Sequence, residues 1–189
     1  MPFFDHFKIF APIYDRVFGI KDEDELVNLA ALENPSIILD VGGGTGRASL
    51  LFLDDHHSVY VVDESLNMLR EARKKGLNCV NAVSEKLPFR TNRFDLILMV
   101  DAFHHVADHT KTLKELTRMT SSAGMAILEE PDIQHWFVKL IALVEKLLLM
   151  RSQFHTPDWI AKKIKQITPA KVSILRKKGI AWIIMDKNT

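Results

Sequence analysis

Four short apolar runs lie along the first two thirds of the chain and are rich in β-branched and aliphatic residues. They cover residues 36–41, 58–62, 94–100 and 123–128. Uninterrupted apolar runs of this length are typical of interior parallel strands, because helices cover both faces of such a sheet. A further short strand is predicted at residues 78–80.

Helical patterns separate these runs. They cover residues 47–53, 65–75 and 109–120, and the second of them ends at Gly76. Strand and helix therefore alternate along the chain, as they do in doubly wound sheets.

The last third of the chain has a different pattern. Residues 134–150 and 157–167 carry apolar side chains at helical spacing. Two strand-like runs, residues 172–175 and 181–185, are joined by a short connection that contains Gly179, which predicts a hairpin. We therefore predict an α/β fold with a Rossmann-like, doubly wound, mostly parallel seven-stranded sheet that ends in an antiparallel C-terminal hairpin.

No linker rich in glycine, proline or serine divides the chain, so a single domain is expected over residues 1–189. A chain of this length buries about two-thirds of its unfolded surface, which is enough for an independent core. Residues 1–30 are expected to form N-terminal cap helices, and residues 131–168 a helical insertion beside the sheet.

The charge of the chain is balanced, with 25 Lys and Arg against 24 Asp and Glu. A net charge of +1 creates no field that would attract nucleic acid or an anionic membrane. The longest apolar stretch, residues 140–150, is interrupted by Glu145 and Lys146 and is too short to span a bilayer. We expect a small-molecule partner, no nucleic acid and no membrane span.

Cys79 is the only cysteine, which excludes an intramolecular disulfide. The N-terminus mixes apolar residues with Asp5, His6 and Lys8, so it lacks the uninterrupted apolar core of a secretory signal. Both observations favour a cytoplasmic setting.

The first apolar run leads directly into a glycine-dense turn. Residues 37–47 read IILDVGGGTGR. Glycines tolerate positive φ and let a ligand approach the bare backbone. A dinucleotide site would use G-x-G-x-x-G, with its last glycine packing helix against strand. Here Gly42, Gly44 and Gly46 form G-x-G-x-G, and Arg47 stands where the dinucleotide motif has glycine.

The element D-x-G-x-G-x-G that begins at Asp40 resembles the first motif of class I S-adenosylmethionine-dependent methyltransferases. The resemblance covers residues 4–130 and implies S-adenosyl-L-methionine as cofactor, with S-adenosyl-L-homocysteine as its product. It implies that the turn binds the cofactor through Asp40, Gly42, Gly43, Gly44 and Gly46.

Further matches follow in the order of the family's motifs. Asp63 and Glu64 end the second strand, where an acceptor-only carboxylate can take both ribose hydroxyl protons. Dinucleotide enzymes also carry an acid there, so Asp63 alone does not discriminate. The resemblance places Met68 near the adenine, although ordinary core packing explains this residue equally well.

The segment around residue 84 is similar to the family's adenine-edge landmark, and Val100 ends the strand that follows it. The common aspartate of this landmark is replaced by Val83, whose side chain cannot accept a hydrogen bond. Backbone groups of Val83 and Ser84, or the carboxylate of Glu85, are the alternatives for holding the adenine.

Near the N-terminus, Ala-Pro-Ile-Tyr-Asp at residues 11–15 resembles the A-x-x-Y-D segment of ubiquinone and menaquinone biosynthesis methyltransferases. The resemblance implies a role for Tyr14 in closing the cofactor site. It also implies a small-molecule acceptor, with residues 131–168 on the acceptor side.

Methyl transfer from a sulfonium is an in-line displacement that needs alignment and water exclusion rather than a protein nucleophile. The candidates for a general base follow the fourth strand and are Asp101, His104 and His105. A role in shaping this loop is the alternative. A metal site that combines His105 and His109 with nearby aspartates is a weaker hypothesis, and we expect no metal.

The leading hypothesis is therefore a methyltransferase for a small molecule, as a monomer or homodimer. The alternatives are a cofactor-binding module without turnover, which acts as a sensor or partner subunit, an RNA or protein methyltransferase, and a nicotinamide-dependent reductase.

Overall fold

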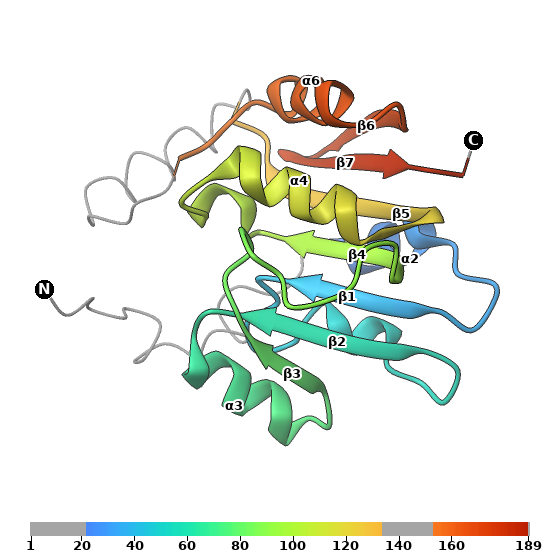
Figure 1. Cartoon of the computed structure of the whole chain (residues 1–189), viewed down its shortest axis with the longest axis vertical. Coiled ribbons are helices and arrows are strands. Elements are labelled where there is room, and N and C mark those ends of the chain that lie inside the picture. The colour runs from blue at the N-terminus through green and yellow to red at the C-terminus, as the bar shows by residue number, and fades with distance from the viewer. Residues whose placement is uncertain (1–21, 134–152, 189) are drawn as a thin grey trace, which may run out of the picture.

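The computed structural model describes residues 22–133 and 153–188 (Figure 1). Within them the strands form one sheet in the order β3-β2-β1-β4-β5-β7-β6. The strands are β1 (Ile37–Val41), β2 (Ser58–Asp63), β3 (Asn78–Asn81), β4 (Phe94–Val100), β5 (Thr120–Pro131), β6 (Lys171–Lys177) and β7 (Ile180–Asp186). The helices are α2 (Glu23–Ala30), η1 (Ser49–Phe52), α3 (Leu66–Lys74), η2 (Phe103–His105), α4 (His109–Met119) and α6 (Pro157–Ile167).

Strand pairing confirms the predicted sheet. The pairs β1–β2, β1–β4, β2–β3 and β4–β5 are parallel, and β7 runs antiparallel to both β5 and β6. Lys177 pairs with Ile180, so the hairpin turn is only two residues long. Lys178 and Gly179 both have positive φ, which suits the right-handed twist of a tight hairpin.

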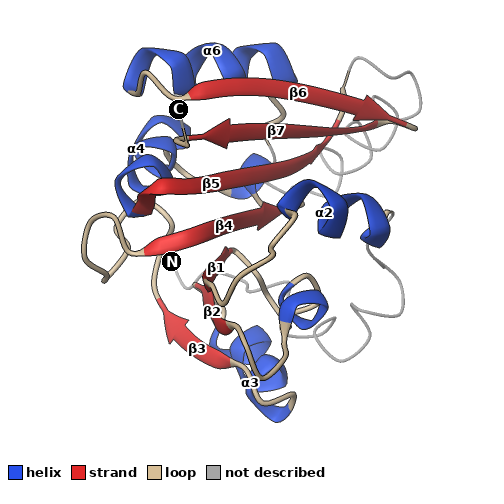
Figure 2. Cartoon of the chain, turned by 90° about the vertical axis from the view of Figure 1, so that its right-hand side faces the viewer, coloured by secondary structure: helices blue, strands red, loops and turns tan. Residues whose placement is uncertain are grey.

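The core has two layers, one on each face of the sheet. Leu39 and Ile97 point to the face that α4 and α6 cover, whereas Ile38, Leu96 and Leu98 point to the face that α2, η1 and α3 cover. Figures 1 and 2 show α4 and α2 on opposite sides of the sheet. Burial on both faces is the reason why the strands appear in the sequence as uninterrupted apolar runs.

The predicted helix at residues 47–53 is wrong. A turn occupies residues 44–48, and only the 3-10 helix η1 follows it. The carboxylate of Asp54 accepts hydrogen bonds from the backbone N–H groups of His56 and His57, each at 2.8 Å. These bonds hold the turn that follows η1.

The other helix predictions in the described residues are confirmed with shifts of one residue or none. Side-chain caps set their starts: Ser65 caps α3, Asp108 caps α4, and Thr156 caps α6 ahead of Pro157. The segment with Tyr14 and the helix predicted at residues 134–150 lie outside the described residues. No helix in the described part of the chain is long and apolar enough to cross a membrane.

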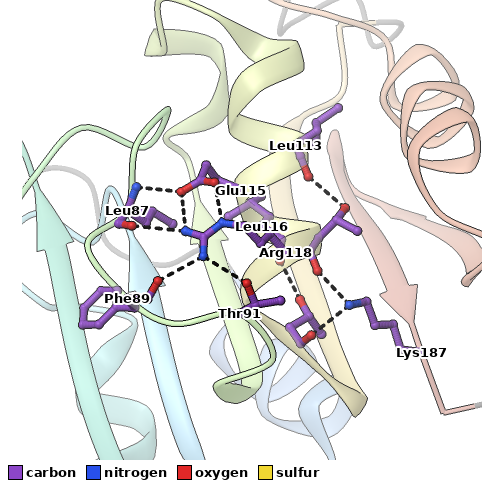
Figure 3. A network of polar contacts seen from close by, with 10 residues as sticks. Leu87, Phe89, Thr91, Leu113, Glu115, Leu116, Arg118 and Lys187 are labelled. Atoms are coloured by element: carbon purple, nitrogen blue, oxygen red, sulfur yellow. Dashed lines mark hydrogen bonds and ion pairs between the residues drawn. The ribbon is translucent and has the colours of Figure 1, made fainter.

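A polar network fixes the connection between β3 and β4 to helix α4 (Figure 3). The Arg118 guanidinium forms a fork with the Glu115 carboxylate, with two contacts of 2.7 Å. It also donates to the backbone carbonyls of Leu87 and Phe89, and Glu115 accepts the N–H of Leu87 at 2.8 Å. A planar guanidinium can make this set of contacts at once, whereas a lysine ammonium cannot.

We expect Arg118→Lys to lower the free energy of unfolding by about 1–2 kcal/mol, because charge-assisted bonds to the two carbonyls and to Glu115 are lost together. Urea unfolding followed by circular dichroism measures this change. The control is Arg70→Lys on α3, where the exposed guanidinium bonds Asn67. Equal effects of the two substitutions would contradict the assigned role of Arg118.

Candidate cofactor and acceptor site

The predicted site residues gather at the carboxyl edge of the sheet. The strands β2, β1 and β4 are adjacent and parallel, so the loops that follow them meet at one edge. The chain order reverses between β1 and β4, and ligands of open α/β sheets bind at such a switch point. The glycine turn follows β1, Asp63 ends β2, and the candidate bases follow β4.

Gly44 presents open backbone beside a carboxylate. Its N–H donates to Asp63 Oδ2 at 3.0 Å, and its φ is +56°. A Cβ built on Gly44 would meet only Asp63 Oδ2, at 4.0 Å. The backbone can therefore be approached closely from this side, as a bound ligand requires.

Gly46 is required for packing rather than for ligand access. Its φ is +79°, and a Cβ there would collide with the side chain of Leu77. This glycine therefore packs the turn against the segment that follows α3. A dinucleotide loop gives this packing role to a glycine one position later.

Asp63 is oriented by two backbone donors. Its Oδ1 accepts the N–H of Ser65 at 2.7 Å, and its Oδ2 accepts that of Gly44. The side-chain amide of Asn81 donates to the carbonyls of Asp63 and of the exposed Glu64. Because each carboxylate oxygen can accept more than one bond, Asp63 is suited to accept from two ribose hydroxyls as well.

Asp40 is fully buried behind the turn. Ser49 Oγ donates to its Oδ2 at 2.7 Å, whereas its Oδ1 has no hydrogen-bond partner among the described residues. Burial, together with the charge of Asp63, raises the pKa of Asp40 to about 6. A buried carboxylate oxygen of this kind fits a cationic partner such as the ammonium group of an amino acid. The residues present therefore fit the amino-acid end and the ribose of S-adenosylmethionine.

The residues predicted to contact the adenine differ from one another in exposure and in hydrogen-bond partners. Val83 is 45% exposed, and Met68 is buried but belongs to neither core cluster. Glu85 has structural partners: its Oε1 accepts the N–H groups of Ala107 and Asp108 at 2.9 and 3.0 Å, and its Oε2 accepts from Ser84 Oγ. Glu85 thus fastens the loop after β4 to the loop after β3. Val100 is buried and is the last residue of β4.

The loop after β4 contains all three candidate bases. Asp101 adopts a positive φ of 54°, and its N–H donates to the carbonyl of Glu129 on the neighbouring strand. His104 is buried, and its Nδ1 lies 2.7 Å from Glu130 Oε2. Burial, with a smaller contribution from His104, lowers the pKa of His105 to about 3, so this ring is neutral at physiological pH.

Sequence reasoning missed Glu130. Its signal was present, because Glu129 and Glu130 are consecutive acids at the carboxyl end of β5, next to β4. The metal hypothesis gains no support: residues 22–133 and 153–188 hold no cluster of three His, Cys, Asp or Glu side chains arranged for a metal ion.

The fold and this edge define a class of protein. A sheet of order 3-2-1-4-5-7-6 with an antiparallel seventh strand is the fold of class I S-adenosylmethionine-dependent methyltransferases, and the glycine turn after β1 and the acid at the end of β2 stand where the sequence motifs of that class predict them. The family model described as "Methyltransferase domain" matches residues 39–128. This segment, a little less than half of the chain, is therefore similar to that family.

Relatives similar in sequence include methyltransferases named for a hydroquinone and for demethylmenaquinone. The chain is 26% identical to the chloroplastic 2-methyl-6-phytyl-1,4-hydroquinone methyltransferase 1 of Oryza sativa subsp. japonica, over 92% of this chain and 58% of that enzyme. It is 29% identical to the demethylmenaquinone methyltransferase of Streptomyces avermitilis, over 77% of this chain and 69% of that enzyme.

Among solved structures, a SAM-dependent methyltransferase of Thermotoga maritima superposes with a TM-score of 0.79 at 22% identity. The superposition covers 96% of this chain and 98% of that one, which supports the fold. The chain spans little more than half of the rice enzyme's length.

We expect Gly44→Ala to weaken binding of S-adenosylhomocysteine at least about tenfold, a loss of roughly 1.4 kcal/mol, because the new methyl group occupies the open side of the turn. Isothermal titration calorimetry measures the dissociation constant. The matched control is Gly76→Ala, where φ is +85° and a Cβ meets nothing within 4 Å.

Both alanines adopt positive φ, so each is expected to lower stability by a similar amount, about 1 kcal/mol. Equal affinity in the two variants would rule out the glycine turn as the ligand's contact.

Asp40 gives the protein a specific pH dependence. Its pKa is higher in the folded chain, about 6, than the ordinary 3.8, so folding favours its protonated form. Its contribution to stability is present below pH 3.8 and is lost as the pH rises through about 6.

We therefore expect Asp40→Asn to gain stability relative to the wild type across that window, by up to about 3 kcal/mol. Denaturant unfolding of both proteins at a series of pH values measures the difference. A difference that stays constant with pH would contradict the raised pKa of Asp40.

Proposed function

We propose that the protein transfers the methyl group of S-adenosylmethionine to a ring carbon of a small hydroquinone. The observation that carries the proposal is the bare turn at Gly44, set between the carboxylates of Asp40 and Asp63. The quinone-pathway relatives, whose printed names specify a phytyl hydroquinone and demethylmenaquinone, support the acceptor class.

In this proposal each of the cofactor residues contacts a different part of S-adenosylmethionine. Asp40 receives the ammonium group, the backbone from Gly42 to Gly46 lies along the amino-acid end, and Asp63 with Glu64 holds the ribose. Val83 and Ser84 contact the adenine edge through backbone groups, and Met68 and Val100 supply apolar contact. Tyr14, outside the described residues, closes the site in this proposal.

The acceptor side suits an aromatic molecule. His104 stacks on Phe154 with ring centroids 4.5 Å apart, and His155 stacks on Trp159 at 3.7 Å. His109 is in edge contact with Phe103 and with His155. Burial lowers the pKa of His109 and His155, so these rings form a neutral aromatic lining.

The bound sulfonium supplies an activated methyl group. The acceptor hydroxyl loses its proton, the ring carbon bonds to the methyl as the sulfur–methyl bond breaks, and the bonding pair stays on sulfur. The ring carbon then releases its own proton, which restores aromaticity, and the phenolate oxygen takes a proton back to become a hydroxyl again, so that one proton leaves overall. The protein has to align the partners, exclude water and accept a proton.

We further propose a single domain over residues 1–189, with residues 1–30 as its cap and residues 131–168 on the acceptor side. The setting is cytoplasmic, in keeping with the lone Cys79, and the state a monomer or homodimer. The net charge of +1 argues against a nucleic-acid substrate.

The test uses the full chain, labelled S-adenosylmethionine and a reduced prenylated hydroquinone with one unsubstituted ring position. We expect labelled product together with S-adenosylhomocysteine. The matched control is the same hydroquinone with that ring position already methylated, which should give none.

Binding of S-adenosylhomocysteine without product from any acceptor would overturn the proposal in favour of a binding module. Label transferred to RNA or protein instead would favour the other methyltransferase class. Heat protection by a nicotinamide dinucleotide alone would favour a reductase.

A further inference from the structure

His104 and Glu130 form a buried pair at the carboxyl edge of the sheet. The histidine follows β4, the glutamate lies on β5, and their side chains are 3% and 4% exposed. Nδ1 of His104 lies 2.7 Å from Oε2 of Glu130. A short contact between such groups in a site of low dielectric is a strong interaction.

The second oxygen of Glu130 is also engaged. Its Oε1 accepts the backbone N–H of Phe103 at 2.8 Å. Because that N–H can only donate, the side chain must present an acceptor to it. An ionised carboxylate offers only acceptors, so with its other oxygen facing His104 it would place the histidine proton on Nδ1 and leave the ring's lone pair on Nε2.

The histidine ring is held from other directions as well. It stacks on Phe154 and lies 4.0 Å, centroid to centroid, from His105. The carbonyl of His104 accepts the N–H of Gln153 at 2.7 Å. A ring fixed in this way needs little reorganisation when it takes up a proton.

Among the described residues, titratable groups around His104 come from β5, η2, α4 and the loop before α6. Glu130 of β5 is the partner in direct contact, and His105 of η2 packs against the ring. Beyond Phe103 lie His109 of α4 and, next to it, His155. His105, His109 and His155 have lowered pKa values, and Glu130 is the carboxylate that contacts the ring among the described residues.

We propose that Glu130 is a positioning residue that fixes the tautomer of His104, and that His104 accepts the hydroxyl proton of the methyl acceptor at Nε2. This inference rests on the proposed function. It assigns the proton-accepting role to one of the three candidate bases, His104. It also adds a residue that the sequence motifs did not indicate.

The decisive substitution is Glu130→Gln. The carbonyl oxygen of the glutamine must face the N–H of Phe103, so its amide NH₂ faces Nδ1 of His104. The histidine then carries its proton on Nε2 and cannot accept another there. We expect kcat to fall about 100-fold at neutral pH, a typical contribution of a general base.

The matched control is Glu129→Gln on the adjacent position. Glu129 is also buried, but it faces the opposite layer, where its Oε2 accepts Trp182 Nε1 at 2.8 Å. A glutamine carbonyl can still accept that bond. We expect less than about a twofold change in kcat for this control, and unchanged affinity for S-adenosylhomocysteine in both variants.

A structural role for Glu130 and a tautomer-fixing role predict different pH profiles. If His104 accepts the proton, the defect of Glu130→Gln should shrink as the pH approaches the acceptor's own pKa, about 10 for a phenol. An ionised acceptor needs no base. A defect that is uniform with pH, or equal to that of Glu129→Gln, would overturn the assignment.

A readout without turnover separates this inference from the proposed function. Nitrogen-15 NMR of the imidazoles in the full chain should show His104 protonated on Nδ1 in the wild type and on Nε2 in Glu130→Gln. The same tautomer in both proteins would disprove the control by Glu130. If the wild type bound cofactor but methylated no hydroquinone, the proposed function would fail. The NMR measurement would still show whether Glu130 fixes the tautomer of His104.

Discussion

The site depends on a buried carboxylate that the described residues leave incompletely satisfied. Asp40 lies behind the glycine turn with one oxygen bonded to Ser49 and the other without a hydrogen bond among the described residues. Burying a charge in this way is unfavourable, and the raised pKa of Asp40 expresses that cost. A cation in the turn would give that oxygen a partner and lower this cost.

The loops around this carboxylate brace one another rather than resting on the sheet alone. Arg118 and Glu115 tie the β3–β4 connection to α4, and Glu85 ties that connection to the loop after β4. Glu130 then ties the loop after β4 to β5. A displacement of one loop therefore disturbs bonds in the next, and this mutual support holds candidate cofactor and acceptor groups in fixed relation.

Much of the fold could be predicted from the sequence because its determinants are local. Interior parallel strands need uninterrupted apolar runs, and the turn between Asp40 and Gly46 needs glycines at particular positions. The helix expected at residues 47–53 is reduced to the 3-10 helix η1, where the N–H groups of Leu51 and Leu53 bond the carbonyls three residues before them. The partnership of His104 with Glu130 could not be read from the sequence, because 26 residues separate two groups that only the β4–β5 pairing brings together.

The alternation of side chains along β5 explains why two adjacent acids contact different layers of the core. Glu129 points to the layer that contains Trp182, and Glu130 points to the layer that contains His104. Each finds a buried donor, so neither is left as an isolated charge. The neutral rings of His105, His109 and His155 form a lining of low polarity on the side of Glu130. In such surroundings a single carboxylate has a strong effect on the imidazole that it contacts, and the aromatic lining can pack against a flat, uncharged acceptor.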